Sequence, residues 1–379
     1  MALKVALVHD WLVSQRGGEA VLETLVELFP AAPIYTLVVD RTRISKKLSG
    51  RDIRPSFLQT LPGAGPEGFR KFLPLFPSAV AGWDLDGFDL IISTSHCVAK
   101  AAGARQNIPH ISYVHTPMRY IWDQWEHYAP SSPLLRTAAT PVRVALQRWD
   151  SASSQRSGLR LLANSNFVAQ RIKRVWKRES HVVYPPVDTD FFFATAEQER
   201  SYWCVVSALV PYKRVGLAVE WANRFERPLI VVGEGPEQKQ LERLAGPTVQ
   251  LKGRVSRQEI RDVFAGALGL IFPGVEDFGI VPLEAMASGV PVLAFGEGGA
   301  LETVSIEAPR ETGALFDEFK ADSIEEAAVR ITKGWEEGKF TRDALRTWAA
   351  QFSIQRFEDQ LRCAIQDELE SLGFDKNMI

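Results

Sequence analysis

The sequence of 379 residues has little that would mark a membrane, secreted or disulfide-bonded protein. Its longest apolar runs, such as the one around residues 268–272, fall well short of the about 20 residues that a membrane-spanning helix needs. The three cysteines, Cys97, Cys204 and Cys363, lie far apart, so they form neither a disulfide framework nor a metal-binding pattern. His9 and Asp10 interrupt the N-terminal apolar stretch too early for a signal peptide. We therefore expect a cytoplasmic protein.

Several motifs of common enzymes are also missing. There is no G-x-S-x-G elbow, no Walker loop, no full dinucleotide fingerprint and no His/Cys cluster with ligand spacing. We therefore expect no metal ion and no other cofactor. Nucleic acid is not an expected partner either, because the total charge is −2 and no nucleic-acid-binding motif is present.

The charge is divided unevenly along the chain. Residues 1–190 contain 23 basic and 16 acidic residues, a net charge of +7, whereas residues 191–379 contain 21 and 30, a net charge of −9. Residues 131–178 carry ten basic residues and a single acidic one, Asp150. This asymmetry favours two units. The basic segment is either a solvated face or a surface that meets anionic lipid or a phosphorylated substrate.

Short apolar segments alternate with amphipathic ones through both halves. Near-continuous apolar strands that alternate with helices predict parallel sheets covered on both faces. We expect strands at 4–9, 34–38, 89–93, 110–114 and 159–163, and again at 203–207, 229–232, 249–251, 268–272 and 290–294. Residues 187–193 read as a linker, and Ser256 and Glu259 as a capping box. The sequence thus predicts an α/β protein of two Rossmann-like domains that face a central cleft.

The stretch 272–289, FPGVEDFGIVPLEAMASG, is the richest candidate for chemistry. Pro282 suits the first position of a helix and Gly289 its exit. The free N–H groups at the start of this helix could bind an anion, and Gly279 lets the backbone approach a ligand. Glu276 and Glu284 could accept hydrogen bonds from sugar or ribose hydroxyls. An acid in the first turn of a helix is also favoured without a ligand, so that reading of Glu284 stays open.

Three further positions follow predicted strands. Gly17 and Gly18 open a helix after the first strand, which suits either a tight turn or close approach to a diphosphate. Lys213 and Arg214 could neutralise a leaving diphosphate, or form a solvated pair. His115 ends a strand and is either a structural residue or part of a ligand cleft.

Taken together, these segments resemble the retaining GT-B glycosyltransferases of family 4. The resemblance covers nearly the whole chain and includes Glu276 with Glu284, Gly17-Gly18-Glu19, VPYKR at 210–214, GEGP at 233–236 and FSIQRFEDQL near the C-terminus. The segment YVHTPMRYIWD is similar to that of mannosyltransferases of bacterial polysaccharide and O-antigen assembly.

This resemblance implies a domain organisation and a set of site residues. It implies an acceptor-binding domain at 1–190, a nucleotide-sugar-binding domain at 191–352, and a helix at 353–379 that crosses back to the first domain. His115, Lys213 and Glu276 would be catalytic. The donor would be bound by Gly17, Gly18, Lys213, Arg214, Arg254, Val255, Glu276, Phe278, Gly279, Ile280 and Glu284.

The implied reaction is metal-independent transfer of a sugar with retention, with mannose from GDP-mannose as the expected donor. Retention by double displacement would need Glu276 as the nucleophile, whereas the resemblance favours front-face attack. The sequence departs from the family at Ala208, where many members have arginine, and this places more of the leaving-group stabilisation on Lys213.

The acceptor is expected to be a glycan or a polyprenyl-diphosphate-linked glycan bound by the first domain. Aromatic and basic residues interleave over 54–76, which suits either a membrane-surface groove or helices that pack their own apolar faces. Peripheral contact with an anionic membrane is therefore expected as well. The alternatives are a nucleotide-sugar epimerase or phosphorylase on the same fold, and a catalytically silent sugar-nucleotide-binding subunit.

Overall fold

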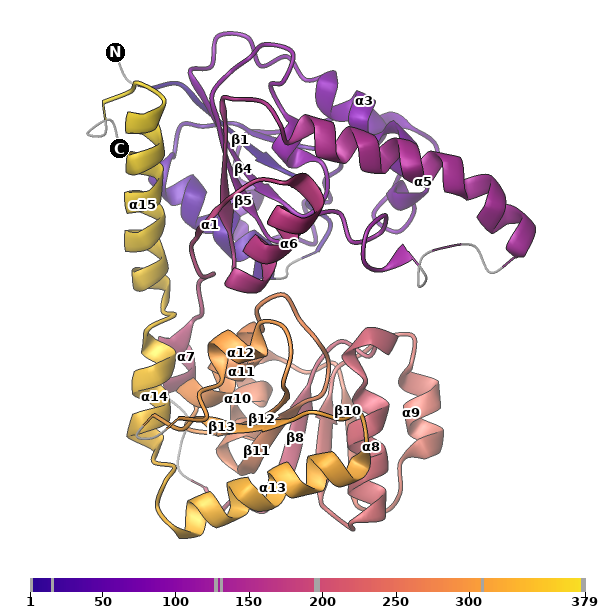
Figure 1. The fold of residues 1–379 in the computed structure, drawn as a ribbon, viewed down its shortest axis with the longest axis vertical. Helices are drawn as coiled ribbons and strands as arrows, with labels where there is room; N and C mark the ends of the chain where they lie inside the picture. The colour runs from indigo at the N-terminus through magenta and orange to yellow at the C-terminus, as the bar shows by residue number, and fades with distance from the viewer. Residues whose placement is uncertain are drawn as a thin grey trace. The chain divides into compact units, whose positions relative to one another are not determined.

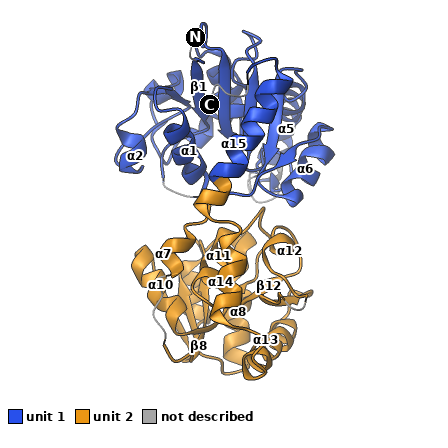
Figure 2. Ribbon diagram, turned by 90° about the vertical axis from the view of Figure 1, so that its left-hand side faces the viewer, with its two compact units in different colours: residues 1–185, 358–379 blue, residues 186–357 orange. Residues whose placement is uncertain are grey.

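The chain folds into two compact units. The computed structural model describes residues 3–14, 17–125, 129, 132–193, 198–307 and 310–375. Unit 1 comprises Met1–Pro185 and Glu358–Ile379, and unit 2 comprises Pro186–Phe357 (Figure 2). The expected boundaries lay after residues 190 and 352, and the structure divides the chain after residues 185 and 357.

Unit 1 is built on a seven-stranded sheet in the order β3-β2-β1-β4-β5-β6-β7, and every pair of neighbours is parallel (Figure 1). Its strands are β1 (Val5–His9), β2 (Ile34–Thr36), β3 (Ile53–Pro55), β4 (Leu90–Ser95), β5 (His110–Val114), β6 (Leu159–Ala163) and β7 (His181–Val182). The central strands β1, β4 and β5 are buried at every position, as expected for a sheet covered on both faces.

The helices of unit 1 are α1 (Gly17–Leu28), α2 (Lys46–Ser49), α3 (Phe76–Ala81), α5 (Pro133–Ser153) and α6 (Asn166–Trp176), with 3-10 turns η1 (Phe57–Thr60), η2 (Phe69–Leu75) and η3 (Ala99–Ala101). The aromatic segment 54–76 largely packs inward, because Leu58, Phe69 and Phe76 are buried in the core. Phe57 and Leu75 remain exposed at 47% and 41%.

Unit 2 has a six-stranded parallel sheet in the order β10-β9-β8-β11-β12-β13. Its strands are β8 (Tyr202–Val206), β9 (Leu229–Val232), β10 (Val249–Gly253), β11 (Ala267–Phe272), β12 (Val292–Phe295) and β13 (Gly313–Phe316). Its helices are α7 (Thr189–Phe193), α8 (Val215–Arg224), α9 (Gln238–Leu244), α10 (Arg257–Ala265), α11 (Ile280–Ala287), α12 (Ala300–Thr303), α13 (Ala321–Glu336) and α14 (Arg342–Ala350), with the 3-10 turn η4 (Pro211–Lys213). The prediction of two α/β units with parallel sheets is confirmed.

Some local predictions are confirmed and others are wrong. The capping box of Ser256 and Glu259 is present at the start of α10. The linker at 187–193 is wrong, because Thr189–Phe193 forms α7, which buries Thr189 and Phe192. Strands β3 and β13 were not foreseen.

The C-terminal helix belongs to both units. Helix α15 (Ile354–Ser371) begins in unit 2, and its residues from Glu358 onward belong to unit 1. Its apolar stripe is buried at Phe357, Leu361, Ile365 and Leu369. None of the helices in the described part of the chain is long and apolar enough to cross a bilayer.

Candidate functional site

Lys213 and Glu276 meet beyond the carboxyl ends of two neighbouring strands of unit 2. Strands β8 and β11 are parallel partners, so the loops that follow them leave the same edge of the sheet. The Nζ atom of Lys213 contacts Oε1 of Glu276, and the two side chains are 14% and 23% exposed. Gly274 permits this approach, because a Cβ atom there would lie 2.8 Å from the Cα of Lys213. Two of the predicted catalytic residues therefore form a partly shielded ion pair.

Glycines allow the backbone conformation and the close packing of the turn between Glu276 and α11. Gly279 precedes the helix with φ +95°, a conformation that favours glycine. The loop after β12 packs against the same turn, where the amide of Gly299 donates to the carbonyl oxygen of Glu276 at 2.8 Å. A Cβ atom on Gly299 would lie 2.3 Å from the Cα of Phe278. Loops from β11 and β12 thus fix the backbone of the turn that carries Glu276, Phe278 and Gly279.

Helix α11 itself departs from the sequence prediction at its start. It begins at Ile280, so Pro282 occupies the third position and not the first. The prediction for its end is confirmed, since Gly289 follows the helix with φ +76°. Proline is tolerated anywhere in the first turn, where its missing N–H has no partner to lose.

Glu284 projects from α11 into a half-buried position beside a second ion pair. Burial raises its pKa from 4.5 to about 7, with Arg257 lowering the pKa and Asp188 raising it. Asp188 and Arg257 pair with each other at 3.0 Å. Glu284 therefore changes its charge near neutral pH. Sequence reasoning missed these two neighbours, and it had assigned Asp188 to a linker.

The other cations predicted to bind the donor have partners elsewhere in unit 2. Arg214, in the left-handed region at φ 52°, places its guanidinium 3.6 Å from the ring centroid of Phe319. Arg254 follows β10 and pairs with Glu234 at 3.2 Å, with both side chains well exposed. Val255, next to it, is half-buried. Lys213 is thus the predicted cation that the structure places against Glu276.

In unit 1, the predicted residues Gly17, Gly18 and His115 come together. Helix α1 starts at Gly17 after β1, and His115 follows β5. A Cβ atom on Gly18 would lie 3.4 Å from Nε2 of His115. A Cβ atom at this distance would be in van der Waals contact with the ring, so the first turn of α1 lies against the imidazole.

Two residues that sequence reasoning did not select, Asp10 and His96, lie at the same edge of the unit 1 sheet. Asp10 follows β1, His96 follows β4, and Nδ1 of His96 lies 3.3 Å from Oδ2 of Asp10. The available signal was their position directly after two buried apolar runs. Their mutual contact, across 86 residues, could not be foreseen.

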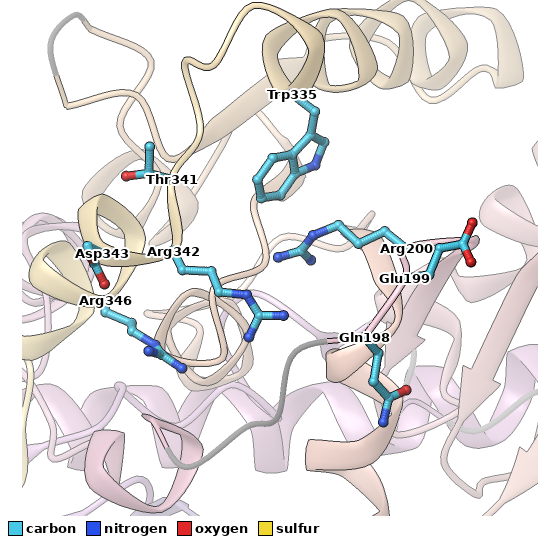
Figure 3. A pocket seen from close by; sticks show the side chains of 8 residues that line it. All are labelled: Gln198, Glu199, Arg200, Trp335, Thr341, Arg342, Asp343 and Arg346. Carbon is cyan, nitrogen blue, oxygen red and sulfur yellow. The ribbon is translucent and has the colours of Figure 1, made fainter.

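Some cavities of the described chain do not lie at these edges. One of about 700 Å³ in unit 2 is lined by Gln198, Glu199, Arg200, Trp335, Thr341, Arg342, Asp343 and Arg346 (Figure 3). Arg200 there donates to the carbonyl oxygens of Ala267 and Gly289, and Arg346 to those of Ala287 and Phe193. The two arginines thus bridge backbone segments of unit 2, and we interpret their role in this cavity as structural. Among the described residues, no cluster of three or more His, Cys, Asp or Glu side chains could hold a metal ion.

Comparison with protein families matches both units. Residues 16–191 match Glycosyltransferase Family 4, and residues 187–346 match the family described as glycosyl transferases group 1.

Curated relatives match over part of the chain. A GDP-mannose-dependent alpha-mannosyltransferase of Mycolicibacterium smegmatis is 33% identical over 168 residues, which cover 41% of this chain and 42% of the relative. A GDP-mannose-dependent alpha-(1-6)-phosphatidylinositol monomannoside mannosyltransferase of Mycobacterium tuberculosis is 34% identical over 176 residues, covering 39% and 45%. The matched segment thus spans less than half the length of these relatives.

Solved structures match over nearly the whole chain. HepE of Anabaena, solved in complex with UDP, has a TM-score of 0.71 at 17% identity and covers 96% of this chain and 100% of its own. Sucrose-phosphate synthase of Thermosynechococcus elongatus has a TM-score of 0.74 at 17% identity and covers 97% and 100%. The predicted GT-B fold is confirmed.

Proposed function

Because the chain belongs to glycosyltransferase family 4, we propose that it transfers a sugar from a nucleotide sugar to a glycan acceptor. The observation that carries the proposal is the Lys213–Glu276 ion pair beside the turn that opens α11. Breaking the bond between a sugar and a diphosphate places negative charge on the leaving group. A preorganised cation stabilises that charge most strongly where water is largely excluded.

We assign the roles within unit 2 from this geometry. Lys213 would bind the donor's diphosphate and so release Glu276 to accept hydrogen bonds from the sugar hydroxyls. The backbone N–H groups of the Phe278-Gly279-Ile280 turn would add donors to the same anionic or polar groups. Glu284, with its pKa near 7, would accept hydrogen bonds from the ribose.

We further propose that the donor is GDP-mannose, and that transfer proceeds with retention and without a metal ion. Two matched relatives are named GDP-mannose-dependent, which supports this donor, whereas HepE was solved with UDP. A test of donor binding must therefore include both GDP-sugars and UDP-sugars. An epimerase is the less favoured alternative, because the matched relatives and families are transferases.

The test compares donor binding and slow donor hydrolysis for GDP- and UDP-sugars in the presence of EDTA. We expect selective binding of GDP-mannose, lost in Glu284→Ala and kept in a control at the exposed Glu220 of α8. If no nucleotide sugar binds, the proposed function is wrong, whereas binding without hydrolysis or transfer would favour the catalytically silent subunit. If binding ignores the Glu284 substitution, the site assignment is wrong. Proton NMR of the transferred anomer distinguishes retention from inversion.

Localisation at an anionic membrane is a separate proposal that rests on helix α5. The first half of this helix extends away from the rest of unit 1 in Figure 1, and it exposes Leu134 and Leu135 at 79% and 60% and Val142 at 43%. Arg136 and Arg148 lie on the same helix, whose first acidic residue is Asp150. Exposed leucines with arginines suit insertion at the surface of an anionic bilayer.

Vesicle sedimentation tests this proposal. We expect the protein to sediment with phosphatidylglycerol-containing vesicles at low salt, and Leu134→Glu with Leu135→Glu to remain in the supernatant. The control is Val329→Glu, which changes a residue of α13 in unit 2 that is 49% exposed. Equal sedimentation of both variants would refute a role for α5.

A further inference from the structure

The segment that follows His115 is held in place by one buried arginine of helix α6. Strands β5 and β6 are parallel neighbours, so the loop after β5 and the start of α6 leave the sheet at the same edge. Arg171 lies in the second turn of α6, where long side chains point back toward the start of the helix. Its side chain is 6% exposed, so it is directed into unit 1 and toward the segment after β5.

The guanidinium of Arg171 contacts both ends of this segment. Its Nη1 donates a hydrogen bond to Oγ1 of Thr116 at 2.7 Å, and its Nε lies 2.6 Å from Oδ2 of Asp123. The ring centroid of Phe167, one turn earlier on α6, lies 4.9 Å from the guanidinium carbon. A planar guanidinium binds two partners at fixed angles, which the compact ammonium of a lysine does not. Arg171 therefore fixes the shape of the segment between Thr116 and Asp123.

Helix α5 holds the same segment from another direction. Arg143 and Gln147, one turn apart on α5, both donate to the carbonyl oxygen of Ile121, at 2.9 and 2.8 Å. The indole nitrogen of Trp122 donates to Oδ2 of the buried Asp150 on that helix at 2.8 Å. These contacts of α5 fix the far end of the segment, whereas Arg171 of α6 also reaches Thr116, the neighbour of His115.

The imidazole of His115 has close neighbours on the side of the sheet. The amide of His115 donates to the carbonyl oxygen of Ser95 at 2.8 Å, and the ring centroid of Tyr113 lies 5.2 Å from that of His115. A Cβ atom on Gly18 would lie 3.4 Å from Nε2 of His115. Since Thr116 is joined to His115 by one peptide bond, a shift of its backbone would move the imidazole relative to these neighbours.

We propose that Arg171 is a positioning residue of this glycosyltransferase and that it acts through His115. By holding Thr116 and Asp123, it fixes the backbone at the end of β5 and with it the place of the imidazole at the edge of the sheet. A displacement of about 1 Å at a reacting group can lower a rate by about 100-fold, so such support matters for catalysis. The inference rests on the proposed function and on the predicted catalytic role of His115.

Substitutions at the Arg171–Thr116 contact test this role in single-turnover hydrolysis of GDP-mannose and of UDP-glucose, well below the melting temperature of each variant. Arg171→Lys keeps the charge beside Asp123, and Thr116→Val removes the oxygen that accepts the bond from Arg171. We expect both to lower the rate constant about tenfold or more, with the affinity for free GDP or UDP within about twofold, because nucleotide binding is assigned to unit 2. Thr116→Ser, which keeps the acceptor oxygen, should retain the wild-type rate constant.

The matched control is Arg174→Lys on the same helix. Arg174 also pairs with Asp123, at 3.0 Å, but its side chain is 65% exposed. An exposed pair of this kind contributes little, so the rate constant should stay within about twofold of the wild type. An equal loss in Arg174→Lys and Arg171→Lys would show that the charge beside Asp123 matters and the bond to Thr116 does not, which would overturn the proposal.

A double variant distinguishes a positioning role from a merely structural one. If Arg171 acts through His115, Arg171→Lys should cause no further loss once His115→Ala has been introduced. A further loss of about tenfold in the double variant would overturn the proposal, because Arg171 would then act on another group or on the fold. An unchanged rate constant in His115→Ala alone would overturn it as well.

Failure of this inference can be told apart from failure of the proposed function. If the wild type binds none of the GDP- and UDP-sugars, the proposed function is wrong, and this inference falls with it. If the wild type hydrolyses a nucleotide sugar and both Arg171→Lys and Thr116→Val keep its rate constant, this inference alone is wrong.

Discussion

The ionisation of Glu284 gives the sharpest prediction for unit 2. The perturbation is Glu284→Gln, which keeps the size and polarity of the side chain and removes its titration. Burial raises the pKa of Glu284 in the folded protein from 4.5 to about 7. The folded state therefore holds a proton that the unfolded state releases, so stability falls as pH rises from about 4.5 to about 7.

The magnitude follows from this difference. A pKa raised from 4.5 to about 7 corresponds to at most about 3.4 kcal/mol, at about 1.36 kcal/mol for each pKa unit. Glu284 is half-buried, so water screens part of the interaction, and we expect about 1–2 kcal/mol. Glu284→Gln should therefore stabilise unit 2 by about this amount at pH 8 and leave it unchanged near pH 4.5.

Thermal and urea unfolding at several pH values between 4.5 and 8 would measure this difference. The quantity of interest is the stability of the variant minus that of the wild type, followed against pH. It should increase through the range and level off above about pH 7. The matched control, Glu220→Gln on α8, should show no such trend. A difference for Glu284→Gln that is flat across the range would refute the buried-carboxyl reasoning.

The same group predicts the pH dependence of nucleotide binding. If Glu284 accepts hydrogen bonds from ribose hydroxyls, the nucleotide binds the charged carboxylate better than the protonated acid. Affinity should then rise with pH up to about 7, with release of a proton on binding. Isothermal titration in two buffers of different ionisation enthalpy would detect that proton. Its absence, or its persistence in Glu284→Gln, would show that another group is responsible.

Three further substitutions test the geometry. Lys213→Ala should lower kcat for transfer by about 10²–10³, whereas the control Lys252→Ala, at an exposed lysine of β10, should leave kcat unchanged. Equal effects of the two substitutions in a steady-state assay would contradict the role of Lys213. Gly18→Val should reduce activity while the melting temperature stays near that of the wild type, because its side chain would press on His115 at the start of α1; full activity would refute close approach. Gly299→Ala should destabilise unit 2 by about 1–3 kcal/mol in urea unfolding, because its Cβ would meet backbone at 2.3 Å, and a neutral result would contradict the packing of the two loops.

Local patterns in the sequence were sufficient to predict most of the scaffold. Apolar runs identified the central strands because a strand buried on both faces tolerates few polar residues. The capping box at Ser256 was readable because both partners lie within one turn of the helix. Helix α7 was missed because it has only five residues, Thr189–Phe193, and follows two prolines. Such a short helix depends on packing against the rest of unit 2 more than on its own propensity.

The candidate site was predicted in part. Glu276 and Lys213 were both selected from sequence, yet their direct contact depends on the pairing of β8 with β11 and on Gly274. The Asp10–His96 pair was not found, because the two residues are 86 positions apart and neither stands in a recognised motif. The raised pKa of Glu284 was equally hidden, since it arises from burial and from Asp188 in the segment before α7, and Arg257 on α10 offsets it only in part.

The division of helix α15 between the two units has a consequence for biosynthesis. Unit 1 buries Leu361, Ile365 and Leu369 and pairs Arg160 with Glu368 at 3.0 Å, but these C-terminal residues leave the ribosome after all of unit 2. Unit 2, from Pro186 to Phe357, is by contrast continuous in sequence. During translation, the apolar face of unit 1 that α15 covers therefore stays exposed at a stage when unit 2 can already fold. The order of completion is thus the reverse of the order in which the two units begin.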